Sequence, residues 1–408
     1  MFRPYPVERL VFGSGESRLL CADAVSDPAL EAYRGRVQTV YADPPFMTGD
    51  RLDGRRPFGE RGWRDGKPTV ALPGFSDRFE SRDDHLALLR GLAEQAKALL
   101  TATGLFMLHT DWHASAHARL LCDGIFGERC FVNEVIWAYE SGGRARRTFS
   151  RKHDTVLIYG RTPDWRLEPE KAAVPRSSRR RSHMRRAVDA DGRPYSIMVS
   201  GGKEYRYYDD DPVTPGDVWT DISHLQQRDP ERTGWPTQKP LKLLLRLLSC
   251  ALHPGELAAD LCAGSGTTAA AAVRLGAHCL AVDLNPAACV MSALRLDLKD
   301  LTLDLPAEAP SGPAGRLDGT LEGSGLLLLS AYDAEDPDFP AGGPLDAVTA
   351  WAAGRIRDGV FLAQDVFLRS QRHPALTPMA LLRPGEGVPA VAVIDAANRL
   401  WVFAWTDE

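Results

Sequence analysis

The sequence lacks the features that would place the protein in a membrane or cross-link it with disulfides. None of its apolar runs approaches the about 20 residues that span a bilayer, and the N-terminal MFRPYPVERLVFGSG has no apolar signal-peptide core. The seven cysteines are scattered, with no C-x-x-C pair, which argues against a disulfide framework and against a zinc finger. We therefore expect a cytoplasmic protein with reduced thiols and no membrane contact.

The sequence also lacks a strong net charge, but its charge is unevenly distributed. Residues 141–210 contain 17 Lys and Arg against 9 Asp and Glu, whereas residues 301–408 contain 7 against 15. The middle region suits contact with a polyanion, which would repel the C-terminal region. A solvated charged surface is the alternative explanation for either region.

Periodicity predicts alternating strands and helices. The expected strands lie within residues 35–45, 104–110, 131–139, 155–160, 256–261 and 277–283, and the expected helices within 82–100, 112–127, 241–252 and 266–275. This alternation predicts an α/β fold with a doubly wound, Rossmann-like sheet. Residues 50–80, rich in proline and glycine, are expected to form a long loop, and residues 388–407 a hairpin in a small C-terminal α+β appendix.

The stretch ELAADLCAGSGTTAAAAVRLGAHCLAVDLN predicts a strand, a glycine turn, a helix and a second strand. Gly264 and Gly266 allow the backbone to approach a ligand closely. Ser265 and Thr267 lie where the helix begins, and its free N–H groups suit an anion. Asp283 ends the second strand, where a carboxylate accepts hydrogen bonds from ribose hydroxyls. The unit therefore indicates a ligand that contains a nucleoside.

Several such ligands can be compared with this turn. The third glycine of the dinucleotide pattern is replaced by Ala269, and there is no G-K-[ST], so a P-loop is excluded. S-adenosylmethionine has a ribose, an adenine and one carboxylate but no pyrophosphate, and it fits so short a turn. A tight turn that binds nothing is the alternative.

A second motif, Asp43-Pro44-Pro45-Phe46, ends an early strand. The prolines fix the backbone and remove two N–H donors, so the turn presents the Asp43 carboxylate and the Pro44 carbonyl as acceptors. Two acceptors can hold the hydrogens of a nucleobase amino group and direct its lone pair toward an electrophilic methyl. A base reaches such a site only by leaving the helix, and Phe46 would then be its stacking surface.

Both motifs follow strands, so they would border one crevice at the carboxyl edge of the sheet. With both in view, residues 8–298 resemble the beta group of DNA amino-methyltransferases. ADPPF (42–46) matches the catalytic motif, DLCAGSGTT (260–268) the cofactor turn and TQKP (237–240) the segment before the glycine strand. HTDWH, IFGERCFVNEVIW, SRKHDTVLIY and DVWTDI resemble further family segments.

The resemblance implies S-adenosylmethionine as cofactor, no metal, and Asp43, Pro44, Pro45 and Phe46 as catalytic residues. The cofactor residues it implies are Asp43, Thr237, Gln238, Lys239, Asp260, Leu261, Cys262, Gly264, Ser265, Gly266, Thr267, Asp283 and Leu284. Cys262 departs from the family's usual Phe, which indicates a differently shaped cofactor contact. D-P-P usually accompanies adenine N6 and S-P-P cytosine N4, so Asp43 favours adenine, with cytosine as the alternative.

The resemblance also divides the chain. Residues 1–140 would be the catalytic half, 141–215 the target-recognition insert, 216–300 the cofactor-binding half, 301–323 a linker and 324–408 an accessory domain. The insert would bind double-stranded DNA through Arg144, Arg146, Arg147, Arg151, Lys152, Arg179, Arg180, Arg181, Arg185 and Arg186. A homodimer, a restriction endonuclease partner and a prokaryotic, nucleoid-associated location are further implications.

Other candidates have simpler explanations. His109, His113 and His117 are spaced by four, but they lack acidic or cysteine partners at metal-site spacing, so structural roles are expected. Trp112 and Trp137 are expected in the core. The alternative functions left open are an RNA or small-molecule methyltransferase and an inactive DNA-binding homologue, while D-P-P-F disfavours a dehydrogenase.

Overall fold

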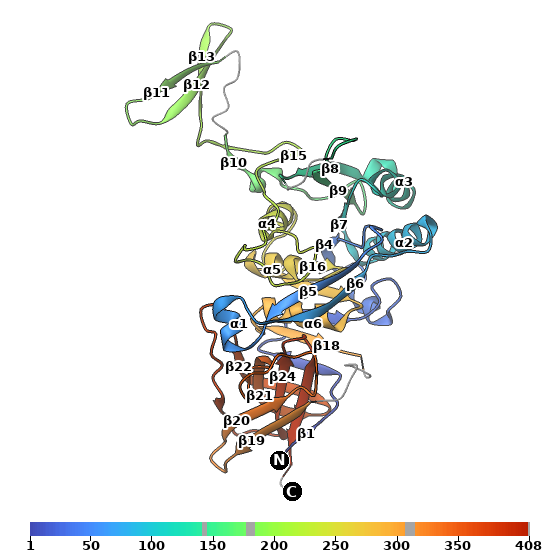
Figure 1. Ribbon diagram of the computed structural model, residues 1–408. Helices are drawn as coiled ribbons and strands as arrows, with labels where there is room; N and C mark the ends of the chain where they lie inside the picture. The colour runs from blue at the N-terminus through green and yellow to red at the C-terminus, as the bar shows by residue number, and fades with distance from the viewer. Residues whose placement is uncertain (141–144, 177–183, 307–314, 407–408) are drawn as a thin grey trace.

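The computed structural model describes residues 1–140, 145–176, 184–306 and 315–406. Within these ranges a mixed sheet runs through the molecule, with helices on both faces of its central part (Figure 1). Its fifteen strands lie in the order β1-β25-β24-β21-β22-β2-β18-β3-β17-β16-β4-β7-β9-β8-β15. The chain therefore builds one continuous sheet from segments that are far apart in sequence.

The central half of the sheet is mostly parallel. Its strands are β2 (Arg9–Phe12), β3 (Ser17–Cys21), β4 (Val37–Ala42), β7 (Leu100–Thr110), β8 (Phe131–Ala138), β9 (His153–Gly160), β15 (Val218–Trp219), β16 (Leu257–Asp260), β17 (His278–Asp283) and β18 (Leu301–Asp304). Strands β3, β17, β16, β4 and β7 pair in parallel, and β9 runs antiparallel to both β7 and β8. All six residues of β4 are buried, as expected for a strand covered on both faces.

Helices cover the two faces of this half. One face packs on α2 (Arg82–Leu99) and α3 (Ser115–Phe126), and the other on α4 (Leu241–Ser249), α5 (Thr267–Arg274) and α6 (Pro286–Arg295). Short 3-10 helices span Pro28–Tyr33, Glu128–Cys130 and Pro169–Ala172. The predicted α/β sheet is confirmed. No helix in the described ranges is long and apolar enough to cross a membrane.

The prediction of a loop at residues 50–80 is wrong. It contains β5 (Arg51–Pro57), α1 (Gly59–Asp65) and β6 (Thr69–Ser76), and the two strands pair with each other. The glycines that suggested a loop allow close backbone approach instead. A Cβ on Gly74 would lie 1.7 Å from the Leu52 carbonyl oxygen, and one on Gly54 would lie 2.3 Å from that of Gly234.

The basic insert contributes two small sheets. Strands β10 (Val174–Pro175) and β14 (Pro212–Val213) form one pair, and β11 (Arg185–Val188), β12 (Pro194–Ser200) and β13 (Lys203–Tyr208) form an antiparallel sheet. Figure 1 shows the three-stranded sheet standing apart from the central part of the molecule. The predicted insert at 141–215 is therefore divided: β9 lies inside the central sheet, whereas β11, β12 and β13 form an arm that stands apart from it.

The C-terminal region extends the central sheet. Its strands are β19 (Arg316–Leu321), β20 (Leu326–Asp333), β21 (Val348–Arg357), β22 (Val360–Leu368), β23 (Met379–Leu381), β24 (Val388–Asp395) and β25 (Leu400–Trp405), and β1 (Phe2–Pro4) joins them by pairing with β25. Strand β22 pairs in parallel with β2. Strands β19, β20 and β23 form a second sheet, and side chains buried between the two sheets make a separate core.

Two predictions for this region need correction. The predicted linker at 301–323 contains β18, which lies inside the central sheet, and β19. The proline and glycine content of this segment predicted a linker, but Leu301 and Leu303 have the alternating buried side chains of a strand. The predicted α+β appendix contains strands and no helix among its described residues, while the predicted hairpin is confirmed by β24 and β25.

A buried arginine connects the C-terminal strands to the rest of the molecule. Arg56 on β5 donates hydrogen bonds to the Asn398 side-chain oxygen and to the Met291 sulfur of α6, at 3.2 Å. Asn398 in turn donates to the Ala287 carbonyl at 3.1 Å. Burial lowers the pKa of Arg56 to about 10, so its guanidinium stays charged at neutral pH.

Replacing this arginine should destabilise the whole fold. Arg56→Ala would leave a cavity and a buried Asn398 oxygen without its donor, and we expect a loss of about 2 kcal/mol in the free energy of unfolding. Chemical denaturation measures this loss. Arg61→Ala, on the exposed surface of α1, is the matched control and should change stability by less than about 0.5 kcal/mol. Equal stabilities for the two variants would contradict the connecting role.

Candidate active site

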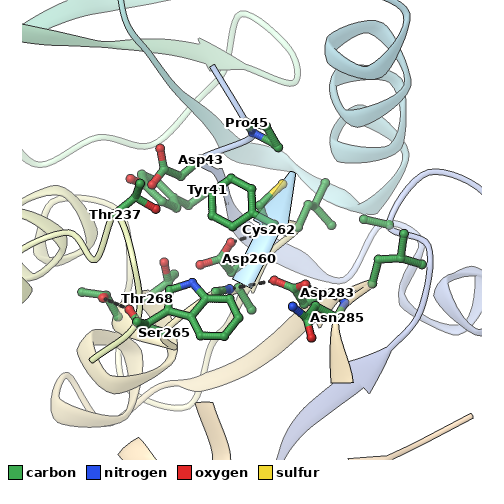
Figure 2. Close-up of a pocket in the computed structure, with 18 of the residues that line it drawn as sticks. Tyr41, Asp43, Pro45, Thr237, Asp260, Cys262, Ser265, Thr268, Asp283 and Asn285 are labelled. Carbon is green, nitrogen blue, oxygen red and sulfur yellow. Dashed lines mark hydrogen bonds between the residues drawn. The ribbon is translucent and has the colours of Figure 1, made fainter. Parts of the chain in front are cut away.

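A pocket of about 500 Å³ opens at the carboxyl ends of β4, β16 and β17 (Figure 2). It is lined by Asp23, Ala24, Val25, Tyr41, Asp43, Pro45, Gly74, Phe75, Ser76, Leu88, Leu92, Trp235, Thr237, Gln238, Lys239, Leu244, Asp260, Leu261, Cys262, Ala263, Gly264, Ser265, Thr267, Thr268, Asp283, Leu284 and Asn285. Both motifs singled out from the sequence therefore border one cavity, as expected from their positions after strands.

The pairing of β4 with β16 explains this meeting. Asp260 lies opposite Tyr41 in the parallel register, so the Asp43 turn and the glycine turn leave the sheet side by side. Strand β17 flanks β16 on the other side and brings Asp283 to the same edge. Figure 2 shows the side chains of Asp43, Asp260 and Asp283 around the cavity.

Asp43 is held by a lysine from another segment. Lys239 Nζ donates to Asp43 Oδ2 at 2.6 Å and lies 4.9 Å from the centre of the Phe46 ring. The second carboxylate oxygen, Oδ1, is buried and accepts no hydrogen bond within the described part of the chain. One oxygen is thus fixed by a cation, and the other is left as an acceptor.

Buried polar contacts support the turn from behind. The Phe46 ring stacks on His109 with their centres 6.1 Å apart. His109 bonds through Nδ1 to the Tyr41 hydroxyl at 2.8 Å and through Nε2 to Asp154 at 3.2 Å. The carbonyl of Pro45 is hydrogen-bonded to a histidine of α2, His85, at 2.8 Å. The aromatic ring and the proline turn are thereby fixed against β7 and α2.

The glycine turn has a conformation that requires glycine. Gly264 has φ +48° and Gly266 φ +72°, and a Cβ on Gly266 would lie 2.7 Å from the Ser292 Cα. Asp283 Oδ2 accepts from the Gly264 N–H at 2.8 Å, and Oδ1 accepts from the Asn285 N–H at 2.8 Å. The carboxylate at the end of β17 therefore holds the turn while it faces the pocket.

The pocket lining contains four acidic side chains, those of Asp23, Asp43, Asp260 and Asp283, and one basic side chain, that of Lys239. Burial raises the pKa of Asp260 to about 7, and the neighbouring carboxylates of Asp43 and Asp283 add to this shift. Burial also raises the pKa of Asp283, against the effect of its two backbone hydrogen bonds. Such a cluster favours a cationic ligand and disfavours a pyrophosphate, which argues against the dinucleotide of a dehydrogenase.

A family model for DNA methylases of the N6 and N4 type matches residues 37–293, more than half of the chain. The chain belongs to this family of DNA methylases. The type II methyltransferase M.BglII of Bacillus subtilis is 27% identical over 148 residues, which are 36% of this chain and 36% of that protein. The match thus spans about a third of that relative's length.

Two further relatives match over longer regions. The DNA adenine methyltransferase YhdJ of Escherichia coli (strain K12) is 22% identical over 289 residues, covering 70% of this chain and 85% of that protein. Among solved structures, the cytosine-N4-specific PvuII DNA methyltransferase has a TM-score of 0.46 and 14% identity, and covers 72% of this chain and 90% of that chain.

The pocket of the methylase contains most of the residues predicted to bind the cofactor. Those that line it are Asp43, Thr237, Gln238, Lys239, Asp260, Leu261, Cys262, Gly264, Ser265, Thr267, Asp283 and Leu284. Gly266, which immediately precedes α5, does not line it and instead packs against Ser292 of α6. Of the four predicted catalytic residues, Asp43 and Pro45 line the pocket, whereas Pro44 and Phe46 lie outside it.

Sequence reasoning missed several lining residues. Tyr41 and Trp235 stand directly beside the predicted motifs, and that proximity could have indicated them. Gly74, Phe75 and Ser76 come from β6, within the segment expected to be a loop, and the sequence carried no signal for them.

The predicted DNA-binding residues fall into distinct environments. Arg144, Arg179, Arg180 and Arg181 lie outside the described residues. Arg146 and Arg147 are exposed, and Arg151 lies over the Trp112 ring at 3.6 Å. The carbonyl of Lys152 accepts from the Tyr139 N–H. Arg185 lies 4.0 Å from Glu204, and Arg186 makes two hydrogen bonds to Asp209 at 2.6 and 2.5 Å, so these two guanidinium groups already have acidic partners.

The burial and the hydrogen-bond partners of the remaining candidates, two tryptophans and three histidines, show their environments. Trp137 is buried as expected, but Trp112 is 43% exposed, so its assignment to the core is wrong. His113 bonds to Asp111 and His117 to Arg82, so the three histidines of the repeat have separate partners. Within the described ranges no group of three or more potential ligands is arranged to hold a metal.

The raised pKa of Asp260 predicts a pH effect on stability. Because its folded-state pKa of about 7 exceeds its ordinary 3.8, its contribution to stability is lost as the pH rises toward 7. Asp260→Asn lacks this titration. When the pH rises from 5 to 8, the natural protein should therefore lose about 2 kcal/mol more of its free energy of unfolding than the Asp260→Asn variant loses. Urea denaturation at both pH values measures the difference, and parallel pH profiles would count against a raised pKa.

Proposed function

We propose that this methylase is an S-adenosylmethionine-dependent DNA methyltransferase that methylates the exocyclic amino group of a base flipped out of duplex DNA. The observation that carries the proposal is the shared pocket. It places an acceptor oxygen of Asp43 beside a glycine turn held by Asp283. Family membership supports the same reaction class.

The pocket residues fit S-adenosylmethionine, which when bound supplies an electrophilic methyl group on a positively charged sulfur. Asp283 is placed at a strand end to accept from ribose hydroxyls, the role that such carboxylates have in nucleoside sites. The negative pocket complements the ligand's positive charge. The buried hydroxyl of Thr268, beside Asp260, is a further polar group in the lining of the pocket.

The acceptor side of the reaction is assigned to the Asp43 turn. Asp43 Oδ1 would accept a hydrogen bond from the amino group, while Lys239 holds Oδ2 and so fixes the direction of the carboxylate. Phe46, whose ring is half-buried against His109, provides aromatic surface for the flipped base. Lys239, which the sequence indicated only as a cofactor residue, thereby gains a positioning role. The assignment uses no metal.

We propose adenine N6 as the target, because the motif begins with aspartate. Cytosine N4 is the second candidate, since the family whose model matches the chain includes methylases of both the N6 and the N4 type. Sequencing with modified-base detection, on DNA from cells with and without the gene, identifies the base and the site. Parallel assays on RNA distinguish an RNA methyltransferase, and absence of methylation on all substrates would leave an inactive DNA-binding homologue.

The division of labour along the chain is part of the proposal. Residues 1–140 and 216–300 would form the catalytic and cofactor-binding halves. Residues 141–215, apart from the buried strand β9, would contact double-stranded DNA. A homodimer, a cognate restriction endonuclease and a nucleoid-associated, cytoplasmic location are the further expectations. Sedimentation of the purified protein tests the first of these.

Removal of the Asp43 carboxylate should separate catalysis from cofactor binding. Asp43→Ala should lower DNA methylation by at least about 100-fold, because the amino group loses its positioned acceptor. Affinity for S-adenosylhomocysteine, measured by calorimetry, should change by less than about 10-fold, since one hydrogen bond contributes about 1 kcal/mol. Normal turnover in this variant would refute the catalytic assignment.

Asp283 should have the opposite profile. Asp283→Ala removes the proposed ribose acceptor and the support of the Gly264 N–H, so the dissociation constant of S-adenosylhomocysteine should rise by at least about 10-fold. Saturating cofactor should restore a large part of the methylation rate. Unchanged affinity in calorimetry would exclude the ribose role.

A further inference from the structure

Phe149 is the most exposed large hydrophobic side chain in the described part of the chain. Its side chain is 97% exposed, whereas the other exposed hydrophobic residues reach at most 75%. It lies in the segment 145–152, which precedes β9 and is called the loop below, with Arg146 and Arg147 before it and Arg151 after it. A fully exposed phenyl ring among cations is a combination expected at a surface that binds nucleic acid.

Arg151 and Lys152, at the end of this loop, contact residues outside it. The guanidinium of Arg151 lies 3.6 Å from the centre of the exposed Trp112 ring, and the His113 ring lies 3.7 Å from that ring. Ala145 N–H donates to the Ser150 hydroxyl at 3.2 Å, and Tyr139 N–H donates to the Lys152 carbonyl at 3.0 Å. The stack of arginine on tryptophan therefore fixes the segment that carries Phe149.

The loop lies at the catalytic edge of the sheet. Strand β9 starts directly after it, and Asp154, the second residue of β9, bonds to His109, on which Phe46 stacks. Trp112 follows the end of β7, the strand beside β4. The loop therefore lies at the same edge of the sheet as Asp43.

Three arginines of the loop, Arg146, Arg147 and Arg151, have no acidic partner among the described residues. By contrast, Arg185 and Arg186 of the arm both have acidic partners. The loop therefore offers cations for phosphates on either side of an apolar tip.

We propose that Phe149 is a wedge that enters the base stack of the DNA at the target nucleotide, with the Trp112–Arg151 stack as its support. This inference rests on the proposed function. An apolar side chain inserted at a base step replaces lost stacking when a base is flipped. The ring would lower the cost of opening the duplex, and the flanking arginines would hold the backbone.

The test uses short duplexes that contain the site found by modified-base sequencing. One duplex is fully paired, and the other has an abasic position opposite the target base, so that opening costs less. Phe149→Ala should slow methylation of the paired duplex by about 10- to 100-fold, but that of the abasic duplex by no more than about threefold. Phe149→Leu should retain a large part of the paired-duplex activity, because it keeps an apolar wedge.

Controls separate this role from others. Leu120→Ala removes another exposed apolar side chain, on α3, and should leave both rates unchanged. Equal losses on the two duplexes, or no loss on either, would overturn the wedge. A changed sedimentation coefficient for Phe149→Ala would also overturn it, because the ring would then belong to an interface between protein chains. If the natural protein methylates neither duplex, the proposed function itself fails; an active natural protein with an unaffected variant refutes the wedge alone.

Discussion

The parallel pairing of β4 with β16 is the contact on which the rest of the site depends. Their motifs are separated by more than 200 residues, yet Asp260 lies directly opposite Tyr41. A slip of one residue would turn every side chain of β4 to the opposite face of the sheet. Tyr41 packs into one core, and Val40 and Ala42 pack into the other, so the two cores together determine where Asp43 points.

The sequence permitted prediction of the parts in which local pattern and tertiary contact agree. The helices of the central half show regular apolar spacing, and the glycine turn needs conformations that few other residues adopt. Both motifs follow buried strands, so their meeting could be deduced from the rules for parallel sheets. The pocket was predictable to the same extent, because Asp260, Gly264 and Asp283 all belong to one strand–turn–helix–strand unit.

The remaining features depend on contacts between distant segments, which produce no recognisable pattern in the local sequence. Gly54 and Gly74 suggested a loop. Both positions require glycine because the backbones of Gly234 and Leu52, respectively, pass too close to leave room for a side chain. Strand β18 is only four residues long, and its short Leu-x-Leu pattern stands beside a proline-rich stretch. The exposure of Trp112 depends on the path of the chain after β7, and the arginine that covers it comes from a loop 39 residues later. Partner choice of this kind is decided by tertiary structure alone.

Lys239 and Asp43 both line the pocket, and the ammonium group of the lysine donates to the carboxylate. In the proposed reaction, Lys239 would lie toward the cofactor and Asp43 toward the DNA base. Any movement of that lysine when one ligand enters alters the geometry offered to the other. The two binding events are then thermodynamically linked, and the linkage is reciprocal. Through this one ammonium group, the methyl donor would then change the affinity for nucleic acid by the same factor as nucleic acid changes the affinity for the methyl donor.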